Sequence, residues 1–330
     1  MWYPPSANFM LEHRFAKLAA IATFLLLVIG GTVNPTGSSL ACPEPTIVCE
    51  GQLFPPMVGG VLYEHGHRLA AMTVGLLQIA LTVLLLRRRP ALRRLAVLLL
   101  AMVVTQGVLG AITVQYKLPW FVSTGHLLLG MSYFATLVYT AFRTRRAATV
   151  IELERHDRLR ADLGDARRWI GIACGTVLVQ LLLGALVRHH GAAMVCLGMP
   201  ACTLGGDWWP REAVQQLHMI HRGFGVVTAV VTSTAAYVVL RRARAWPSLR
   251  LLALAAPLLV AGQVALGVYT VMTLRSVPVA VGHFAGATAL WALWISAWLM
   301  TGRRSASSAA APREASSGSA VPPLGMAVTP

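Results

Sequence analysis

Charged residues are scarce in this chain of 330 residues, of which only 12% are Asp, Glu, Lys or Arg. Soluble globular domains carry roughly twice that share, so a soluble core is excluded. Hydrophobic residues make up 56% of the chain, and several apolar runs reach lengths that are typical of helices crossing a lipid bilayer. The composition therefore predicts an all-α integral membrane protein.

Acidic residues are scarcer still, because 12 Asp and Glu face 28 Lys and Arg, a formal net charge of +16. In a soluble protein such an excess would suggest nucleic-acid binding. Here the arginines gather in short segments between apolar runs, as at 87–94 and 241–244, which is the pattern of cytoplasmic loops. The charge therefore indicates membrane topology, and we expect no nucleic-acid partner.

Eight apolar spans can be placed along the chain, with arginine-rich segments after the second, fourth, sixth and eighth. Their predicted bounds are about 17–33, 69–86, 95–114, 121–142, 169–187, 214–240, 249–272 and 279–301. Because positive loops stay in the cytoplasm, we expect both termini inside and the two cysteine-bearing loops outside. The first span is interpreted as a retained helix rather than a signal peptide, because its counterpart, 169–187, lies in mid-chain.

The chain divides into two similar halves. We expect an N-terminal four-helix bundle (1–142), a charged cytoplasmic linker helix (143–168), a C-terminal four-helix bundle (169–302) and a disordered tail (303–330). Several residues of the first half recur 154 or 157 positions later: Cys42, His67, Arg68, Gln106 and His126 match Cys196, His221, Arg222, Gln263 and His283. Such a match indicates an internal duplication, and four spans per half predict a pseudo-twofold axis along the membrane normal.

Each half places two histidines at the same depth on its even-numbered spans, His67 with His126 and His221 with His283. This arrangement suits the ligation of one haem iron from both faces, and neighbouring small residues leave room for a flat macrocycle. A single histidine at a helix end would be read as interfacial and solvated, but four in register favour haem. Zinc or copper is the alternative, although neither half offers the further compact ligands of a closed zinc site, apart from Glu64.

Arg68 and Arg222 each follow one of these histidines directly. A guanidinium can bind a haem propionate with two parallel hydrogen bonds. The alternative is an arginine that extends to the membrane boundary while its stem stays in the apolar region. We predict the propionate role for both.

The cysteines form two close pairs in the loops that are expected outside, Cys42 with Cys49 and Cys196 with Cys202. Because that side is oxidising, we predict a disulfide in each loop. The disulfides would either staple the loops over the haem sites or exchange with an external thiol partner. The fifth cysteine, Cys174, is predicted to be a buried small hydrophobic residue.

The two halves differ at Glu64, whose place is taken by His218 in the second half. On a helix starting near Tyr63, Glu64 and His67 share a face, so only the first half offers a carboxylate one turn from its iron ligand. Such a carboxylate suits proton or water handling, while the alternative is an acid that complements the dipole of a helix N-terminus. The histidines without a partner pattern are predicted to lie on the surface: His13, His65, His156, His189 and His190.

From the first span to the eighth, these motifs resemble the haem A synthase family. The resemblance is carried by the paired-cysteine loops, Glu64-x-x-His67-Arg68, His221-Arg222, and the segments beginning at Gln106 and Gln263, each followed twenty residues later by a histidine. It implies that His67 and His126 flank a substrate haem O, that His221 and His283 hold a haem b, and that Glu64 is important for turnover. It also implies that Cys42 and Cys49 form the functionally sensitive pair.

The same resemblance implies oxidation of a ring methyl of haem O to the formyl group of haem A, by two successive hydroxylations and loss of water. The implied setting is the plasma (inner) membrane of a bacterium, with haem O synthase as a source of substrate and cytochrome oxidase assembly as the acceptor of haem A. A homo-oligomer is left open. Two other functions also stay open: a di-haem electron carrier would need the four histidines but not Glu64, and a haem transporter would need polar groups or broken helices at mid-membrane, where the spans are almost purely apolar.

Overall fold

The computed structural model describes residues 11–145 and 150–302, and all the regular elements in these ranges are helices. They are α1 (Leu11–Val33), α2 (Gly59–Arg88), η2 (Pro90–Leu92), α3 (Arg93–Gln115), α4 (Trp120–Arg143), α5 (Val150–Ala161), α6 (Ala166–His189), η3 (Ala192–Met194), α7 (Ala213–Arg242), α8 (Pro247–Met272) and α9 (Val277–Met300). Eight of the described helices are long and apolar enough to cross a membrane. The predicted all-α membrane fold is therefore confirmed, whereas the predicted tail, 303–330, lies outside the described residues.

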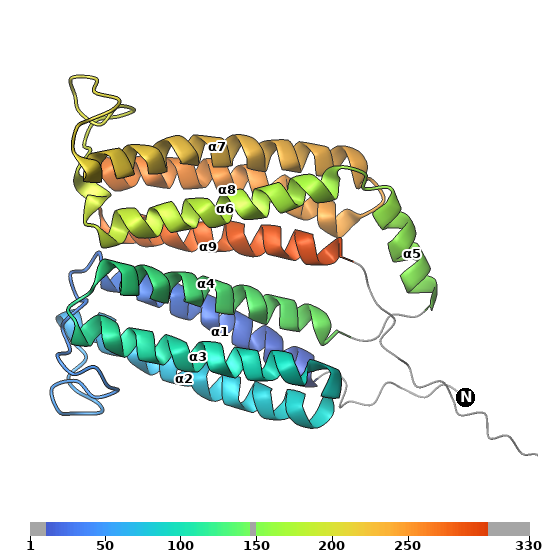
Figure 1. The fold of residues 1–330 in the computed structure, drawn as a ribbon, viewed down its shortest axis with the longest axis horizontal. Helices are drawn as coiled ribbons and strands as arrows, with labels where there is room; N and C mark the ends of the chain where they lie inside the picture. Colours follow the sequence, from blue (N-terminus) through green and yellow to red (C-terminus); the bar gives the residue numbers. More distant parts are fainter. Residues whose placement is uncertain (1–10, 146–149, 303–330) are drawn as a thin grey trace, which may run out of the picture.

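The eight long helices pack as two groups of four (Figure 1). Helices α1 to α4 form the first bundle and α6 to α9 the second, and the bundles meet where α4 contacts α6 and α9 and where α1 contacts α9. At this contact the indole N–H of Trp291 in α9 donates a hydrogen bond to the carbonyl of Met131 in α4, at 3.4 Å. The bundles correspond to the expected halves, although domain limits at 142 and 169 stay a prediction.

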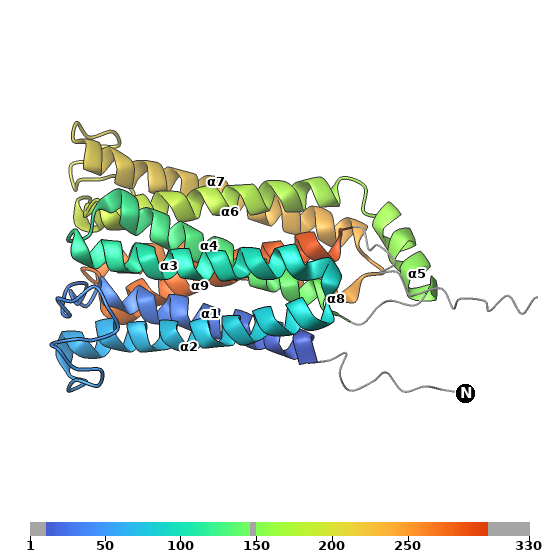
Figure 2. The same ribbon diagram turned by 60° about the horizontal axis from the view of Figure 1, so that its bottom comes forward.

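Large apolar side chains cover the outside of both bundles. Leu76, Val226, Leu251 and Leu258 are each more than 60% exposed. A water-soluble monomer rarely exposes so much contiguous apolar surface, so these side chains mark the surface that faces lipid. The two long loops, α1 to α2 and α6 to α7, lie together at one end of the molecule, and α5 lies at the other (Figures 1 and 2).

The duplication extends to the backbone. Helices α2 and α7 have 30 residues each and begin 154 positions apart, while α4 and α9 have 24 each and begin 157 apart. The turns before α4 and α9 both contain two successive non-glycine residues with positive φ, at 117–118 and 274–275. In each turn the second of these residues donates its N–H to a threonine carbonyl five positions earlier, at 2.7 Å. The pseudo-twofold axis itself stays a prediction.

Helix α2 begins earlier than predicted. Its first residue is Gly59, one turn before the expected start near Tyr63, and it follows an extended Val58. Pro55 and Pro56 disfavour helix immediately before it. The charged segment 64–68 consequently occupies the second and third turns of α2 rather than its start, so its side chains project from an established helix.

Candidate functional site

A cavity of about 680 Å³ lies in the first bundle, near its loop end. Its volume is within the range of cofactor and small-molecule sites. The residues of the first half that were predicted to act at a haem all line this one cavity: Glu64, His67, Arg68 and His126. The structure thus brings together, from α2 and α4, the residues that were predicted to act together.

The rings of His67 and His126 lie against glycines of neighbouring helices. A Cβ added at Gly30 in α1 would lie 2.7 Å from Cε1 of His67, and one added at Gly110 in α3 would lie 3.4 Å from Cε1 of His126. The Nδ1 atoms of both histidines are buried and have no hydrogen-bond partner in the described part of the chain. The carbonyl of His126 accepts a hydrogen bond from Gln106 Nε2, at 2.8 Å. Two imidazoles therefore border a shared cavity. Each ring fits in its place because the residue behind it is a glycine.

The second bundle repeats this arrangement with His221 and His283. Cβ atoms added at Gly184 in α6 and Gly267 in α8 would lie 3.2 and 3.3 Å from Cε1 of these rings. The amide of Gln180 lies 3.2 Å from both Nδ1 and the carbonyl of His221, and it can fix that ring. The supporting glycines have the spacing of the histidines, 154 and 157 positions, which is a sequence signal that was overlooked.

This donor set fits a haem with two axial histidines better than a zinc site. In the described ranges, only one group of three His, Cys, Asp or Glu side chains is close enough to bind one metal ion: Cys42, Cys49 and His65. None of the four predicted haem ligands belongs to this group. Closed zinc sites need four ligands around one ion. Two imidazoles per bundle, each packed on a glycine, are side chains that would hold a haem iron.

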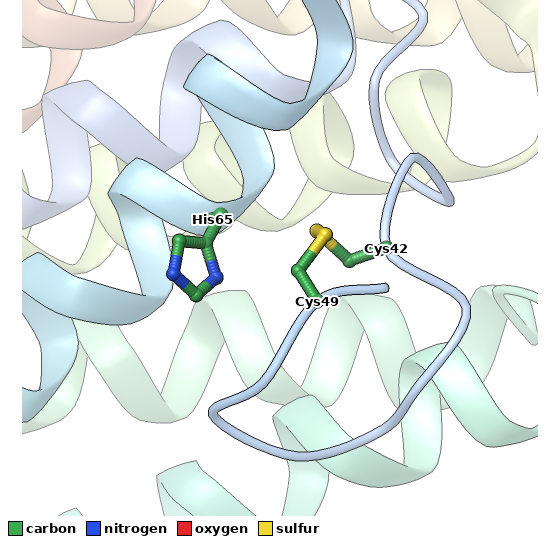
Figure 3. A group of neighbouring side chains, drawn as sticks. All are labelled: Cys42, Cys49 and His65. Carbon is green, nitrogen blue, oxygen red and sulfur yellow. A yellow bond between two sulfur atoms is a disulfide. The ribbon is translucent and has the colours of Figure 1, made fainter. Parts of the chain in front are cut away.

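Both predicted disulfides are present, Cys42–Cys49 and Cys196–Cys202. Figure 3 shows the ring of His65 beside the first disulfide. Because the two sulfur atoms are bonded to each other, they are not free thiolates that could bind a metal together with His65. Cys174 is the free cysteine of the described residues and is half-buried in α6.

The prediction that His65 lies on the surface is wrong. His65 is fully buried, and its Nε2 lies 2.8 Å from the carbonyl of Leu53. His156 is also buried, with Nε2 3.0 Å from the carbonyl of Met300, and His13 and His189 are half-buried. His190 is exposed as predicted. The buried rings bind backbone carbonyls from other segments, and such contacts leave no pattern in the sequence.

Arg68 and Arg222 bind the disulfide loops. Their guanidinium groups donate to loop carbonyls at 2.6 to 3.4 Å, Arg68 to those of Cys42, Glu44, Thr46 and Val48, and Arg222 to those of Cys196, Gly198, Pro200 and Ala201. Each arginine thus holds one loop against the bundle, a role that the sequence did not predict. Binding of a propionate by these arginines stays a prediction. It would need guanidinium N–H groups that do not already donate to the loop carbonyls.

Glu64 joins the same loop to the wall of the cavity. Its Oε2 accepts a hydrogen bond from the backbone N–H of Cys42 at 2.9 Å, and its Oε1 accepts one from Arg68. The side chain is buried, as is that of His218 at the equivalent place in α7. At this equivalent position the first half therefore buries a carboxyl group and the second half buries an imidazole.

A polar network adds to this asymmetry. The hydroxyl of Tyr133, which lines the cavity, donates to Gln78 Oε1 at 2.8 Å, and Gln78 Nε2 donates to Thr82 at 2.9 Å. At the duplicated offsets, the second bundle has threonine, leucine and alanine in place of Gln78, Tyr133 and Thr82. Only the first bundle thus has this network.

Three residues of the second bundle also line the first cavity: Arg188 and His189 from the end of α6, and Phe284 from α9. The sequence reasoning assigned none of them to a site. His189 Nδ1 lies 3.0 Å from the hydroxyl of Thr124 in α4, which ties the end of α6 to the first bundle. The first cavity is therefore built by both halves of the chain.

Comparisons with known proteins agree with this picture. The model of the COX15-CtaA family, described as cytochrome oxidase assembly protein, matches residues 58–295. Among the curated relatives, the Heme A synthase of Symbiobacterium thermophilum is 34% identical over 264 residues, covering 77% of this chain and 84% of that protein. The Heme A synthase of Shouchella clausii is 28% identical over 278 residues, covering 79% and 86%.

The family match spans both bundles, from the start of α2 into α9, and includes all four paired histidines. It confirms the resemblance expected from the motifs. The chain belongs to the COX15-CtaA family of cytochrome oxidase assembly proteins, the family of the haem A synthases.

Proposed function

We propose that this chain is a haem A synthase, an oxidoreductase that converts a ring methyl of haem O into the formyl group of haem A. The observation that carries the proposal is the first cavity, where the histidine pair, a buried carboxylate and a polar network meet. The second bundle repeats the histidines but lacks the carboxylate and the network. A duplicated protein with one reacting site and one electron-transfer site accounts for that difference.

In this proposal His67 and His126 position the substrate haem in the first cavity, and Gly30 and Gly110 leave room for their rings. His221 and His283 hold a haem b in the second bundle. When bound, that haem supplies one-electron transfer. The protein's own contribution is to orient the substrate, to exclude water from most of the cavity and to handle protons.

The chemistry sets what Glu64 must do. Converting a methyl group and one water into a formyl group releases four protons and four electrons in total, through a hydroxymethyl and then a gem-diol that loses water. Glu64 is the carboxylate that lines the cavity. We assign to it the acceptance of these protons, or the orientation of the water whose oxygen is incorporated. The four electrons would leave one at a time, by way of the haem held by His221 and His283, to an external oxidant.

The remaining expectations follow from this function. The two bundles would be the haem domains, 1–142 and 169–302, with 143–168 as the linker. The protein would lie in the inner membrane of a bacterium, with the disulfide loops on the outer side and the termini in the cytoplasm. Arginines in the last turns of α2 and α7, at the ends away from these loops, support this orientation. Haem O synthase and cytochrome oxidase assembly would be its supplier and its client.

Pigment analysis tests the proposal. The chain is co-expressed with a source of haem O in cells that lack their own haem A synthase, and the haems are extracted and separated by chromatography. Haem A should appear only when the chain is present. Bound haem without any haem A would favour the di-haem electron carrier and contradict the proposed enzyme.

A further inference from the structure

Arg188 belongs to α6 of the second bundle, yet its side chain lines the cavity of the first. Its Nη2 makes one long hydrogen bond, 3.4 Å from the carbonyl of Gly30, and its Nε is buried without a partner. Among the described residues, no carboxylate forms an ion pair with it. Placing a cation in such surroundings is costly unless an anion compensates for the lost hydration. The protein offers no such anion in the part of the chain described.

The position of Arg188 is fixed by contacts between the bundles. Its guanidinium lies 5.9 Å from the centroid of the Phe284 ring, and that ring packs on Gly31 of α1, where an added Cβ would lie 2.8 Å from it. The neighbouring His189 contacts Thr124 of α4. The end of α6 is therefore held against the first bundle from two sides, and the guanidinium lies near Gly30 and Phe284, which also line the cavity.

Arg188 has no counterpart in the duplication, so only the first of the two repeated sites receives an arginine from the other half. The position 154 residues before Arg188 is Asn34, so the duplication provides no matching arginine from α1 to the second bundle. Arg68, the other arginine lining the first cavity, already donates to four loop carbonyls and to Glu64. Arg188 is thus the less engaged guanidinium of the two.

We propose that Arg188 binds a propionate of the substrate in the first cavity, so that the second bundle supplies part of the substrate site of the first. The inference rests on the proposed function, because the two propionates are the carboxylates of haem O. A guanidinium binds a carboxylate through two parallel N–H···O hydrogen bonds, which gives orientation as well as affinity. Arg188 then fixes which way round the macrocycle lies between His67 and His126.

The test compares two forms of one ligand. Full-length protein is expressed without a haem O source, purified with its second-half haem, and titrated with haem O and with haem O dimethyl ester, in which both propionates are uncharged. The variants are Arg188→Gln, Arg188→Lys and, as a matched control, Arg275→Gln. Arg275 lies at the same end of the second bundle and donates to the carbonyl of Asn34 at 2.8 Å, but it does not line the cavity.

Wild-type protein should bind the free acid more tightly than the ester. Arg188→Gln should weaken binding of the free acid roughly tenfold to a hundredfold and leave the ester unchanged, as expected when a hydrogen-bonded charge pair is lost. Arg188→Lys should bind the free acid with an affinity between those of the wild type and Arg188→Gln. Arg275→Gln should not weaken the binding of either ligand. An unchanged second-half haem spectrum shows that each variant is folded.

The inference would be overturned if Arg188→Gln weakened the binding of the free acid and of the ester equally, or weakened neither. Unchanged binding of both is expected if Arg188 binds a lipid phosphate instead. Failure of wild-type protein to bind haem O in either form would contradict the proposed function itself. The two failures are therefore distinguishable.

Discussion

Among single residues, Glu64 gives the sharpest prediction. Glutamine keeps the volume of the side chain but cannot accept a proton, and its single amide oxygen can accept only one of the two hydrogen bonds that Glu64 accepts from Cys42 and Arg68. If Glu64 handles protons, Glu64→Gln should lower the haem A yield per folded molecule by about a hundredfold or more and leave the second-half haem b in place. Haem O or its hydroxymethyl form should accumulate, as measured by chromatography of extracted pigment.

Arg68→Gln is the control for this prediction, because it removes one of the two hydrogen-bond partners of Glu64 and loosens the loop while keeping the carboxylate. A loss of product as large in Arg68→Gln as in Glu64→Gln, with haem O still bound as tightly as in the wild type, would mean that Glu64 acts by holding the loop. A wild-type yield from Glu64→Gln would show that its charge takes no part in the reaction.

The glycines behind the histidines give a second residue-level prediction. A Cβ at Gly184 would lie 3.2 Å from His221, whereas a Cβ at Gly175, on the same helix, would meet nothing within 4 Å. Gly184→Ala should therefore shift or broaden the haem b absorption bands, while Gly175→Ala should leave the spectrum unchanged. Identical spectra for the two variants would mean that this glycine does not set the position of His221.

Residue by residue, the sequence was most informative where a feature occurred twice. The paired cysteines and histidines could be identified because each match supports the other, and the glycine pairs could have been found in the same way. Burial of His65 and His156 could not be predicted, because each depends on a single carbonyl from another segment. Arg188 was overlooked for a related reason: its environment comes from the contact between bundles.

For the elements, the disulfide loops make the most testable difference between the halves. The first loop is joined to Glu64 through the N–H of Cys42, whereas the second has His218 in place of that carboxylate. Cys42→Ser or Cys49→Ser should therefore lower turnover, while Cys196→Ser or Cys202→Ser should chiefly lower stability, by about 2 to 4 kcal/mol. Haem A yield and thermal unfolding of all four variants test this, and equal turnover per folded molecule would remove the distinction.

Prediction of the helices worked because hydropathy identifies spans by length and composition. It placed the start of the second span at about residue 69, ten residues after the observed start of α2, since the charged segment 64–68 interrupts the apolar pattern. Those side chains bind the loop and face the cavity rather than lipid, so α2 can carry them within its second and third turns. A polar segment continuous with an apolar run can thus belong to the same helix when protein covers it.

In the whole molecule, the two bundles have unequal proposed functions although they are alike in backbone. The equivalent helix lengths and turns show the likeness, and Glu64, Tyr133 and Arg188 show the difference. The likeness was predictable from the repeated motifs. The contribution of α6 and α9 to the first cavity was not, because it depends on how the bundles pack.

The most direct test of this division is the haem inventory of two double variants, His67→Ala with His126→Ala and His221→Ala with His283→Ala, each co-expressed with a haem O source. Purified protein is examined by absorption spectroscopy and pigment chromatography, per mole of folded protein. We expect the first variant to keep a low-spin b-type haem and to make no haem A, and the second to lose the b-type haem. Haem A at the wild-type level from the first variant, or an unchanged b-type spectrum in the second, would contradict this expectation.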